Sequence, residues 1–439
     1  MTGNGKKVAF LTLGCKVNMY DTEAMTELFL QKGYDIVDFE GFADIYIINT
    51  CTVTNFGDKK SRQMIRRAKR KNPLAIVVAT GCYAQVAGDE VAEIDGVNIV
   101  IGTKSRKEVV EIVENYKDGV VNAVSSIKNL KEFENTPIES NKGRTRAYVK
   151  IQDGCNRYCT YCIIPYARGN VRSRDKEDIL KEVKVLAEKG FKEVVLTGIH
   201  VASYGLDKEN IGLADVVEAV HDIEGIERIR FSSMEPKAVT EEFVERMKAL
   251  PKVCDHYHLS LQSGCNETLK RMNRRYTAEE YLEVCERLRA AFPNVAITTD
   301  IIVGFPGESE EDFKECVDFA QKVHLDKIHV FPYSPKKGTP AAKFQNQIKN
   351  EIKSERSRKL IDTSDELNRN FLSRFIGKTM PVLFETTSDG YNAGHTSNYI
   401  KVLVKGSEDL NNKIIPVKIT SIAEPEVVYG VIEEGDGEG

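Results

Sequence analysis

Three cysteines lie close together in the segment GCNRYCTYC, where Cys155, Cys159 and Cys162 have the spacing C-x3-C-x2-C. A closed structural zinc site needs four ligands, and no fourth cysteine or histidine lies nearby in the sequence. Three thiolates on one tight loop suit a 4Fe-4S cluster with one iron that has no protein ligand. S-adenosylmethionine (SAM) can chelate such an iron, and the reduced cluster can cleave SAM to a 5′-deoxyadenosyl radical. A zinc or disulfide loop whose missing ligand is remote is the structural alternative.

A second set of cysteines, Cys15, Cys51 and Cys82, stands in the contexts LGC, NTC and TGC. Each of these cysteines closes a predicted strand and precedes a predicted helix. The carboxyl ends of parallel strands share one edge of a sheet, so the three side chains can converge there. Gly14 and Gly81 would let the backbone turn tightly beside a bulky ligand. A single cysteine of this kind could equally be a small buried hydrophobic residue. Three cysteines, each between a predicted strand and the next helix, predict a second cluster with an open iron.

The elements that must position these cysteines follow from the apolar pattern. In the first part of the chain, short apolar runs alternate with segments of helical periodicity, which indicates a βαβ domain with a parallel sheet over residues 1–130. The predicted strands are 8–13, 45–48, 76–79 and 98–101, and the predicted helices are 21–32, 59–71 and 88–94. Residues 131–146 are polar and read as a linker.

A second βα series follows and predicts an α/β domain over residues 147–373. Six βα units suit a partial barrel better than a closed eightfold one. The predicted strands are 147–151, 193–196, 228–231, 256–261, 296–303 and 327–331. A long charged helix is predicted near 349–375. After it, the sequence pattern changes to short apolar runs, typical of strands, separated by Gly, Asn and Ser. Strands at 380–385, 399–404, 413–422 and 426–432 predict a small β-barrel over residues 374–439.

Composition excludes several classes of protein. No apolar run is long enough to span a bilayer, and the polar first residues do not resemble a signal peptide, so we expect a cytoplasmic protein with no membrane partner. In such a chain, the ten cysteines indicate free thiols and metal ligands rather than a disulfide framework. A net charge of −4 argues against nucleic-acid binding through overall charge, so a nucleic acid would need a local basic patch.

The cysteine loop at 155–162 resembles the signature of the radical SAM superfamily, whose core is a partial βα barrel with SAM across the strand ends. Short motifs after the later predicted strands resemble SAM-contacting motifs of the superfamily. One differs: Thr197-Gly198-Ile199-His200 stands where the superfamily often has Gly-Gly-Glu. The resemblance implies that Cys155, Cys159 and Cys162 hold the radical cluster. It also implies SAM contacts by Tyr161, Thr197, Gly198, His200, Ser232, Glu235, Gln262, Val303 and Gly304.

The pairing of both cysteine sets with a C-terminal barrel resembles the methylthiotransferases, over essentially the whole chain. This resemblance implies two 4Fe-4S clusters, two SAM per turnover and a C-terminal TRAM barrel. In that family, one SAM methylates a sulfur on the N-terminal cluster, which Cys15, Cys51 and Cys82 would hold here, and a second SAM yields the radical that activates the substrate carbon. The sequence motifs LTLGCKVNMYDTE and FPYSPKKGTPAA most resemble those of the MtaB branch of this family. That branch acts on N6-threonylcarbamoyladenosine beside the tRNA anticodon.

Partners are expected accordingly: the anticodon stem-loop of tRNA, an electron donor such as flavodoxin or ferredoxin, and a sulfur source. Residues 59–71 hold eight basic residues in thirteen, and on a helix Met64, Ile65 and Ala68 would face the sheet. The basic side chains are either a solvated face or a phosphate-binding patch. The sequence predicts that Arg144, Arg146, Arg168, Arg172 and Arg174 extend this patch, and that Phe384, Tyr391 and Tyr399 offer stacking surfaces for RNA.

Other functions remain open from the sequence. Within the same chemistry, the substrate can be isopentenyladenosine in tRNA or an aspartate of a ribosomal protein. In a different class, the chain would be a non-catalytic RNA-binding protein with structural zinc. Cys254, Cys265, Cys285 and Cys316 share no spacing that suggests a third metal site, so core or surface thiols are expected there.

Overall fold

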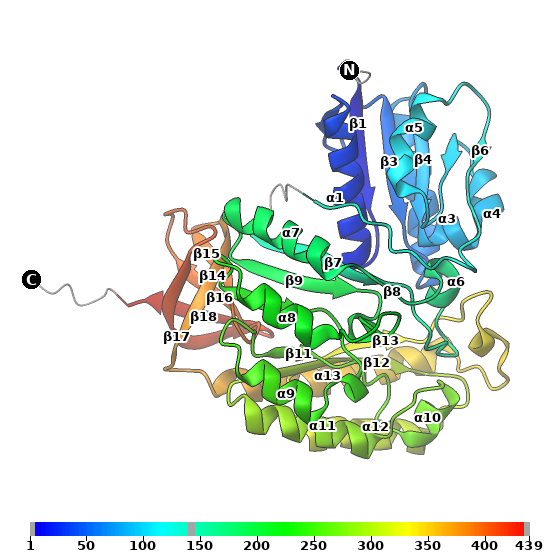
Figure 1. Ribbon diagram of the computed structural model, residues 1–439. Coiled ribbons are helices and arrows are strands. Elements are labelled where there is room, and N and C mark those ends of the chain that lie inside the picture. Colours follow the sequence, from blue (N-terminus) through cyan, green and yellow to red (C-terminus); the bar gives the residue numbers. More distant parts are fainter. Residues whose placement is uncertain (1–4, 139–144, 434–439) are drawn as a thin grey trace, which may run out of the picture.

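A computed structural model describes residues 5–138 and 145–433, and Figure 1 shows three assemblies of strands along the chain. The first assembly is a parallel six-stranded sheet of order β2-β1-β3-β4-β5-β6, called here the N-terminal sheet. The four predicted strands are confirmed, whereas the two edge strands were missed because they are only two and three residues long. The strands are β1 (Lys7–Thr12), β2 (Asp35–Val37), β3 (Ile45–Thr50), β4 (Ile76–Gly81), β5 (Ile99–Val100) and β6 (Val121–Asn122).

Helices cover both faces of the N-terminal sheet. Met25 and Phe29 of α1 pack with α5 on one face, and α2, α3 and α4 bury their apolar residues on the other. On α2, Met64, Ile65 and Ala68 are buried as predicted, and the Thr54 side chain caps its first turn. The helices are α1 (Lys16–Gln31), α2 (Asn55–Lys71), α3 (Cys82–Val86), α4 (Gly88–Ala92) and α5 (Val109–Glu114).

The second assembly, called here the central barrel, is open. Its strands form a sheet of order β10-β9-β7-β8 and a sheet of order β11-β12-β13, which isolated parallel bridges join between β10 and the segment around β11. The six predicted parallel strands are confirmed, and the short antiparallel β8 was missed. The strands are β7 (Arg146–Asp153), β8 (Arg172–Ser173), β9 (Glu193–Gly198), β10 (Arg228–Phe231), β11 (His256–His258), β12 (Ala296–Val303) and β13 (Lys327–Pro332).

The two faces of the central strands differ in polarity. Alternate residues such as Val149, Ile229 and Tyr257 belong to the largest hydrophobic cluster, beneath the outer helices. Since side chains alternate along a strand, the inner face carries the residues between them, among which Lys150, Arg230 and His258 are polar. The helices are α6 (Ile164–Arg168), α7 (Lys176–Glu188), α8 (Leu213–His221), α9 (Glu241–Lys248), α10 (Asn266–Arg271), α11 (Ala278–Ala291), α12 (Glu310–Val323) and α13 (Asn350–Ser373). Short 3-10 turns are η1 (Arg106–Glu108), η2 (Val201–Ser203), η3 (Pro236–Ala238) and η4 (Pro340–Lys343).

The third assembly is a closed five-stranded barrel of order β14-β15-β16-β18-β17, called here the C-terminal barrel. It sits at the amino-terminal end of the central strands (Figure 1), where Arg228 of β10 donates to the carbonyls of His395 and Pro381 at 2.9 and 2.8 Å. Four of its strands were predicted, and β15 was missed because its sequence, YNAGHT, lacks an apolar run. The strands are β14 (Thr379–Ser388), β15 (Tyr391–Thr396), β16 (Lys401–Lys405), β17 (Ile414–Glu424) and β18 (Val427–Ile432).

Two further findings concern the chain as a whole. The described residues contain no helix that is both long and apolar enough to cross a bilayer. Cys254, Cys265, Cys285 and Cys316 are buried, as expected of core thiols. The domain boundaries at 130, 146 and 373 stay predictions, and residues 139–144 of the predicted linker lie outside the described residues.

Candidate active site at the edge between two parallel sheets

The structure places Cys15, Cys51 and Cys82, called here the N-terminal cysteines, at one edge of the N-terminal sheet. Cys15 precedes α1, Cys51 directly follows β3, and Cys82 begins α3 directly after β4. The Asn18 side chain donates to the carbonyls of Leu13 and Thr50 at 2.8 and 3.1 Å, and so holds two of the three strand ends together.

Gly14 shows how tightly these strand ends pack. It has a φ of +102°, and a Cβ built on it would lie 2.9 Å from Cys51 Cβ and 3.0 Å from Cys51 Sγ. A side chain at this position would therefore fill the space beside the Cys51 thiol, and the backbone conformation disfavours one as well.

The thiols of this set affect one another electrostatically. Burial, followed by the charges of Cys82 and Cys15, raises the pKa of Cys51 to about 11. Burial also raises the pKa of Cys82, against the opposing charge of Arg168. Such thiols stay protonated until a metal displaces the proton, which is the usual course of metal binding to cysteine.

Cys155, Cys159 and Cys162, called here the loop cysteines, follow the carboxyl end of β7. Gly154 starts the loop with a φ of +74°, and a Cβ there would overlap the Asn170 carbonyl oxygen, so only glycine fits. The Cys155 amide donates to the Gly169 carbonyl at 3.0 Å, and the Thr160 amide donates to the Met272 carbonyl at 3.0 Å. These backbone contacts fix the loop at both ends.

An arginine with a largely buried side chain, Arg274, contacts the loop cysteines. Arg274 Nη1 lies 3.3 Å from Cys159 Sγ, and its Nε donates to the Tyr276 hydroxyl at 2.9 Å. Burial raises the pKa of Cys155 to about 11 and that of Cys162 to about 12. Arg274 was missed in the sequence, because an isolated arginine far from the cysteine motif carries no pattern.

Neither cysteine set is closed around a single ion. Among the described residues, no group of three or more His, Cys, Asp or Glu side chains is arranged to hold one metal ion. Three cysteine thiols are the protein ligands that a 4Fe-4S cluster with one open iron takes, and each set offers three. The guanidinium groups beside Cys82 Sγ and Cys159 Sγ suit a group with thiolate ligands, because they can donate to the ligand sulfurs.

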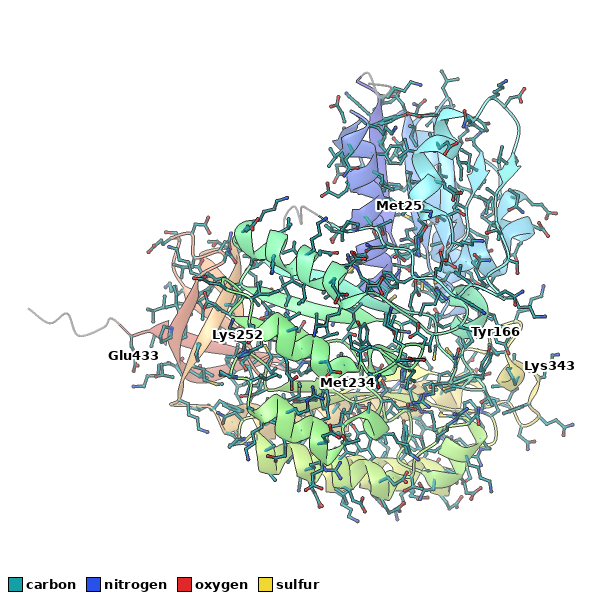
Figure 2. All side chains as sticks on the ribbon, in the orientation of Figure 1. Met25, Tyr166, Met234, Lys252, Lys343 and Glu433 are labelled. Atoms are coloured by element: carbon teal, nitrogen blue, oxygen red, sulfur yellow. The ribbon has the colours of Figure 1, made fainter. Side chains whose placement is uncertain are left out.

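Arg168 of α6 lies between the two cysteine sets. Its side chain is fully buried, with Nε 3.3 Å from Cys82 Sγ and Nη2 2.5 Å from Asn18 Oδ1. Its Nη1 lies 2.8 Å from Asp21 Oδ2 and 3.2 Å from Asp153 Oδ2. One guanidinium from the central barrel therefore contacts α1, α3 and the end of β7. Its neighbour on α6, Tyr166, is 47% exposed where the N-terminal sheet meets the central barrel (Figure 2).

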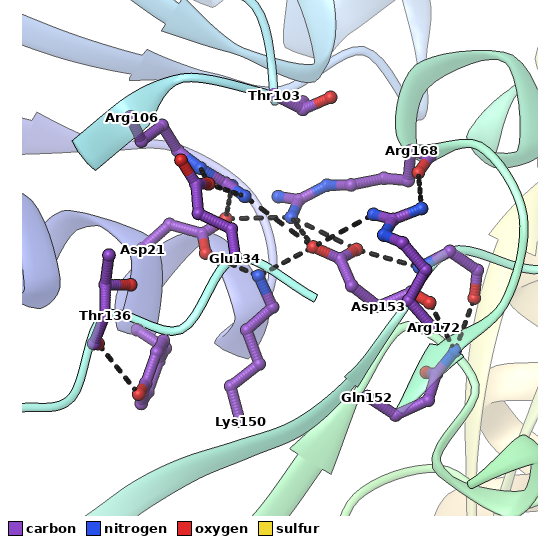
Figure 3. Close-up of polar contacts among 12 residues, drawn as sticks. Asp21, Thr103, Arg106, Glu134, Thr136, Lys150, Gln152, Asp153, Arg168 and Arg172 are labelled. Carbon is purple, nitrogen blue, oxygen red and sulfur yellow. Dashed lines mark hydrogen bonds and ion pairs between the residues drawn. The ribbon is translucent and has the colours of Figure 1, made fainter. Parts of the chain in front are cut away.

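Asp21 and Asp153 anchor a buried charge cluster around Arg168 (Figure 3). Lys150 Nζ lies 2.9 Å from Asp21 Oδ1 and 2.6 Å from Asp153 Oδ2, and Arg106 pairs with Asp21. Burial opposes the charged form of Asp153, but Lys150, Arg168, Arg172 and Arg106 outweigh it and hold the pKa of Asp153 well below its usual range. Each carboxylate is thus shared by several cations from separate segments.

The predicted extension of the basic patch by arginines near the loop is wrong. Arg168, Arg172 and Arg174 are at most 3% exposed and are occupied by internal contacts, such as that of Arg174 with Glu182 at 2.5 Å. Arg146 is partly buried and pairs with Glu385 at 2.9 Å. These residues satisfy buried carboxylates and are not available to phosphates. Arg144 lies outside the described residues.

Several of the predicted SAM contacts follow successive strand ends. Thr197 and Gly198 end β9, and His200 Nε2 lies 3.4 Å from Glu235 Oε2, beyond β10. Arg157 of the cysteine loop lies 2.5 Å from the same oxygen. Burial opposes ionisation of Glu235, but His200, Arg274 and Arg157 outweigh it and lower its pKa. His200 and Glu235 are therefore brought together beside the loop cysteines.

The remaining predicted contacts each have distinct surroundings. Ser232 Oγ is buried and has no hydrogen-bond partner in the described part of the chain, which suits a site for a polar ligand. Gln262 has a φ of +72°, an uncommon conformation for a residue other than glycine. Gly304 follows the buried Val303, and a Cβ on it would overlap Lys353 Cγ. Tyr161 packs edge-on against Phe305, with ring centroids 6.4 Å apart.

The basic face of α2 is only partly free. Arg62 donates to Tyr83 and lies 3.4 Å from Glu90, and Arg67 and Lys71 pair with Glu40. Among the described residues, no contact is found for the charged ends of Lys59, Lys60, Arg66 and Arg70. The prediction that Phe384 offers a stacking surface for RNA is wrong, because its side chain is fully buried. Tyr399 is 38% exposed and Tyr391 is partly exposed.

Comparisons with known proteins agree with this arrangement. Residues 149–320 match the model of the Radical SAM superfamily, and residues 7–102 match that of the uncharacterized protein family UPF0004. Among solved structures, the radical SAM methyltransferase TsrM from Kitasatospora setae has a TM-score of 0.57 at 14% identity, over 89% of this chain and 80% of that one. This likeness shows a shared fold.

Curated relatives extend the match to nearly the whole chain. The threonylcarbamoyladenosine tRNA methylthiotransferase MtaB of Bacillus subtilis is 44% identical over 95% of this chain and 94% of its own. MtaB of Aquifex aeolicus is 44% identical over 94% of this chain and 100% of its own. The tRNA-2-methylthio-N(6)-dimethylallyladenosine synthase of Clostridium novyi is 38% identical over 94% of both. This chain belongs to the radical SAM methylthiotransferase family.

Proposed function

We propose that this enzyme converts N6-threonylcarbamoyladenosine next to the tRNA anticodon to its 2-methylthio derivative. It uses two 4Fe-4S clusters and two SAM per product. The observation that carries the proposal is the position of Arg168, which contacts Cys82 of one triad, beside Gly169, whose carbonyl accepts from the Cys155 amide of the other. Sulfur donation and carbon activation can then take place on one bound base.

The loop cysteines would hold the radical cluster, and the residues around them would bind SAM. Bound there, the cluster and SAM would supply radical chemistry at an unactivated carbon of the substrate. The protein contributes position and charge. Arg274 donates to Cys159 Sγ, and Tyr161 and the partnerless Ser232 hydroxyl offer an aromatic and a polar contact for SAM. The other proposed SAM contacts are Thr197, Gly198, His200, Glu235, Gln262, Val303 and Gly304.

The N-terminal cysteines would hold the sulfur-donating cluster. Three thiols are one fewer than the irons of a 4Fe-4S cluster, so a cluster held here would supply an open position for sulfur. Asn18 fixes two of the strand ends, and Arg168 donates to Cys82 Sγ. Hydrogen bonds to ligand sulfurs are a general means of tuning such clusters.

The choice of substrate rests on the relatives. Two of them at 44% identity carry threonylcarbamoyladenosine in their names, and the dimethylallyladenosine synthases match over a similar length at 38% identity or less. The isopentenyl-type substrate is therefore the second candidate. A ribosomal-protein aspartate is a third, but none of these relatives carries it in its name. Membership of an enzyme family excludes the non-catalytic zinc protein.

The cellular setting follows from this reaction. The protein would act in the cytoplasm, where tRNA is modified, with an electron donor such as flavodoxin or ferredoxin and a sulfur source. The exposed basic residues of α2, which begins four residues after Cys51, would bind phosphates of the anticodon stem-loop.

The test is mass spectrometry of tRNA nucleosides from a host that lacks methylthiotransferases, with and without this gene. We expect 2-methylthio-N6-threonylcarbamoyladenosine to appear only when the gene is expressed. If the methylthio isopentenyl nucleoside appears instead, the substrate assignment is overturned while the reaction stands. If neither appears while both clusters are intact, the tRNA substrate is wrong.

A further inference from the structure

The inner face of the central barrel carries a polar cluster on β11, β12 and β13. His258 Nδ1 lies 2.9 Å from Thr298 Oγ1, and its Nε2 lies 3.3 Å from Asp300 Oδ2. The His329 ring of β13 packs against the His258 ring, with centroids 5.7 Å apart. His258, Asp300 and His329, called here the inner-face cluster, belong to neither cysteine set and to none of the predicted SAM contacts.

The strand register fixes how the inner-face cluster lies along the barrel. In the parallel pair of β12 and β13, Asp300 is opposite His329, and Ile302 is opposite Phe331. Because side chains alternate along a strand, these four residues share the inner face, whereas Ile301 packs beneath the outer helices. Phe331 therefore lies one inner-face position, about 6.6 Å, closer to the carboxyl ends of the strands than His329.

These carboxyl ends lie at the same end of the barrel as the loop cysteines. The strands β7, β9 and β10 are parallel, as are β11, β12 and β13, and isolated parallel bridges join the two groups. The cysteine loop also contacts the chain just beyond β12 and β13. Tyr161 packs against Phe305, and the Ala341 amide donates to the Thr160 carbonyl at 2.9 Å. A base held beside the loop can therefore reach the inner face of these two strands.

The inner-face cluster is open to a ligand. His329 is exposed, Phe331 is 48% exposed, and the Asp300 side chain is 29% exposed. Within the described residues, the ring nitrogens of His329 make no hydrogen bond, and the Asp300 carboxylate approaches only His258. Partial burial and the charge of His258 outweigh Asp300 and lower the pKa of His329. The His329 ring is therefore neutral near neutral pH and has one donor and one acceptor.

We propose that His329 and Asp300 bind the threonylcarbamoyl substituent of the target adenosine and thereby select this substrate. The inference rests on the proposed function and names how the same site recognises its base. Asp300 accepts from the N–H or hydroxyl groups of the substituent, and His329 donates to one of its oxygens. A dimethylallyl group offers no such groups and would cover both side chains without giving them a partner.

The shape of the base agrees with this assignment. The substituent is attached to N6, on a different edge of the purine from C2, the carbon that receives sulfur, so it points away from C2. With C2 directed to the loop cysteines, the substituent extends along the strands from the level of Phe331 to that of His329. Phe331 offers an aromatic contact for the purine ring.

The test uses two anticodon stem-loop RNAs, one with N6-threonylcarbamoyladenosine and one with N6-dimethylallyladenosine. In the reconstituted enzyme, His329→Phe keeps a ring on β13 but removes its hydrogen bond. We expect the Kd of the threonylcarbamoyl RNA to rise about 10-fold and its kcat/KM to fall by the same factor, the effect of one lost hydrogen bond. The Kd of the dimethylallyl RNA should not rise. His329→Gln, which keeps a donor and an acceptor, should retain part of the preference.

A second variant and a control separate recognition from folding. Asp300→Asn, which turns one carboxylate oxygen into an amide, should also raise the Kd of the threonylcarbamoyl RNA alone. His324→Phe is the matched control, because this exposed histidine ends α12 on the outside of the barrel, and both Kd values should stay unchanged. A wild-type Kd for the threonylcarbamoyl RNA in both cluster variants, or equal rises for the two RNAs, overturns the inference. Failure of the wild type to modify the threonylcarbamoyl RNA overturns the proposed function itself.

Discussion

Arg168 donates from Nε to the Sγ of Cys82 across 3.3 Å, although 86 positions separate the two residues. The neighbours of Arg168 make related contacts: the Ala167 carbonyl accepts from Thr103 Oγ1 at 2.6 Å, and the Gly169 carbonyl accepts from the Cys155 amide at 3.0 Å. Three consecutive residues therefore touch both cysteine sites.

Substitution of Arg168 should weaken both stability and the N-terminal cluster site. Arg168→Gln leaves Asp21 and Asp153 with one cation fewer in a buried setting, and losing one partner of such a pair costs about 3–5 kcal/mol. We expect a lower Tm of the cluster-free protein by calorimetry and less iron bound after reconstitution. Arg168→Lys keeps the charge and should lose less on both counts. An unchanged Tm in Arg168→Gln would refute the buried pairing.

Gly14 should be irreplaceable for a steric reason as well as a conformational one. Gly14→Ala combines a left-handed φ, which costs about 1–2 kcal/mol, with a Cβ 2.9 Å from Cys51 Cβ. Gly33→Ala is the matched control, since its φ is +79° and nothing lies within 4 Å of the added Cβ. Iron content and Tm should fall further in Gly14→Ala than in Gly33→Ala. Equal losses would show that the contact with Cys51 is unimportant.

The sequence predicted the frame of the site but not its electrostatics. Buried apolar runs predicted the strands, and a cysteine at the end of three of them predicted one edge, because parallel strands align their carboxyl ends. Arg168 was singled out for a phosphate surface, because a basic residue near a motif looks the same in sequence whether it is buried or exposed. The contact of Lys150 with Asp21 joins residues 129 positions apart, and no periodicity marks it. Long-range ion pairs become visible only when the two sheets are docked.

The two cysteine sets should separate into two activities. Cys155→Ala should abolish SAM cleavage, because the loop would lose a ligand of the radical cluster. Cys51→Ala should still produce 5′-deoxyadenosine but form no methylthio nucleoside. Liquid chromatography with mass spectrometry measures both products in one reaction, and iron analysis checks the remaining cluster. An active Cys51→Ala enzyme would exclude the N-terminal cysteines as the sulfur site.

Asp326 should make stability depend on pH. Burial raises the pKa of this carboxyl from its usual acidic range to about 7. The folded state therefore holds a proton that the unfolded state releases, and the stabilisation is complete at low pH and is lost as the pH rises through about 7. The loss is at most about 4 kcal/mol, since one pKa unit corresponds to about 1.4 kcal/mol.

The comparison that isolates this group is Asp326→Asn, which keeps an oxygen to accept the Ile297 amide. Relative to this variant, the wild-type Tm should fall as the pH rises from about 4 to about 7 and then level off. Asp222→Asn is the control, because that side chain is 85% exposed. Parallel Tm profiles for wild type and Asp326→Asn would contradict the raised pKa.

The exposed basic residues of α2 should govern the salt dependence of RNA binding. Replacing Lys59, Lys60 and Arg66 by Gln should weaken binding of the anticodon stem-loop. The slope of log Kd against log salt should fall by up to about 3, one for each phosphate that no longer meets a cation. Replacing Lys314 and Lys322 of α12 by Gln should not change the slope. An unchanged slope in the α2 variant would mean that this face is only solvated.

The charge cluster around Asp21 also restricts how such a protein can diversify. Asp21 comes from the same helix that Cys15 caps, while Lys150 and Arg168 come from the central barrel. A chimera that exchanges the first hundred or so residues between distant relatives would bring together two halves of a charge pattern that were never selected as a pair. Recombination at this boundary is thus expected to succeed only between parents that share both halves, so that the two cysteine sites are inherited as one unit.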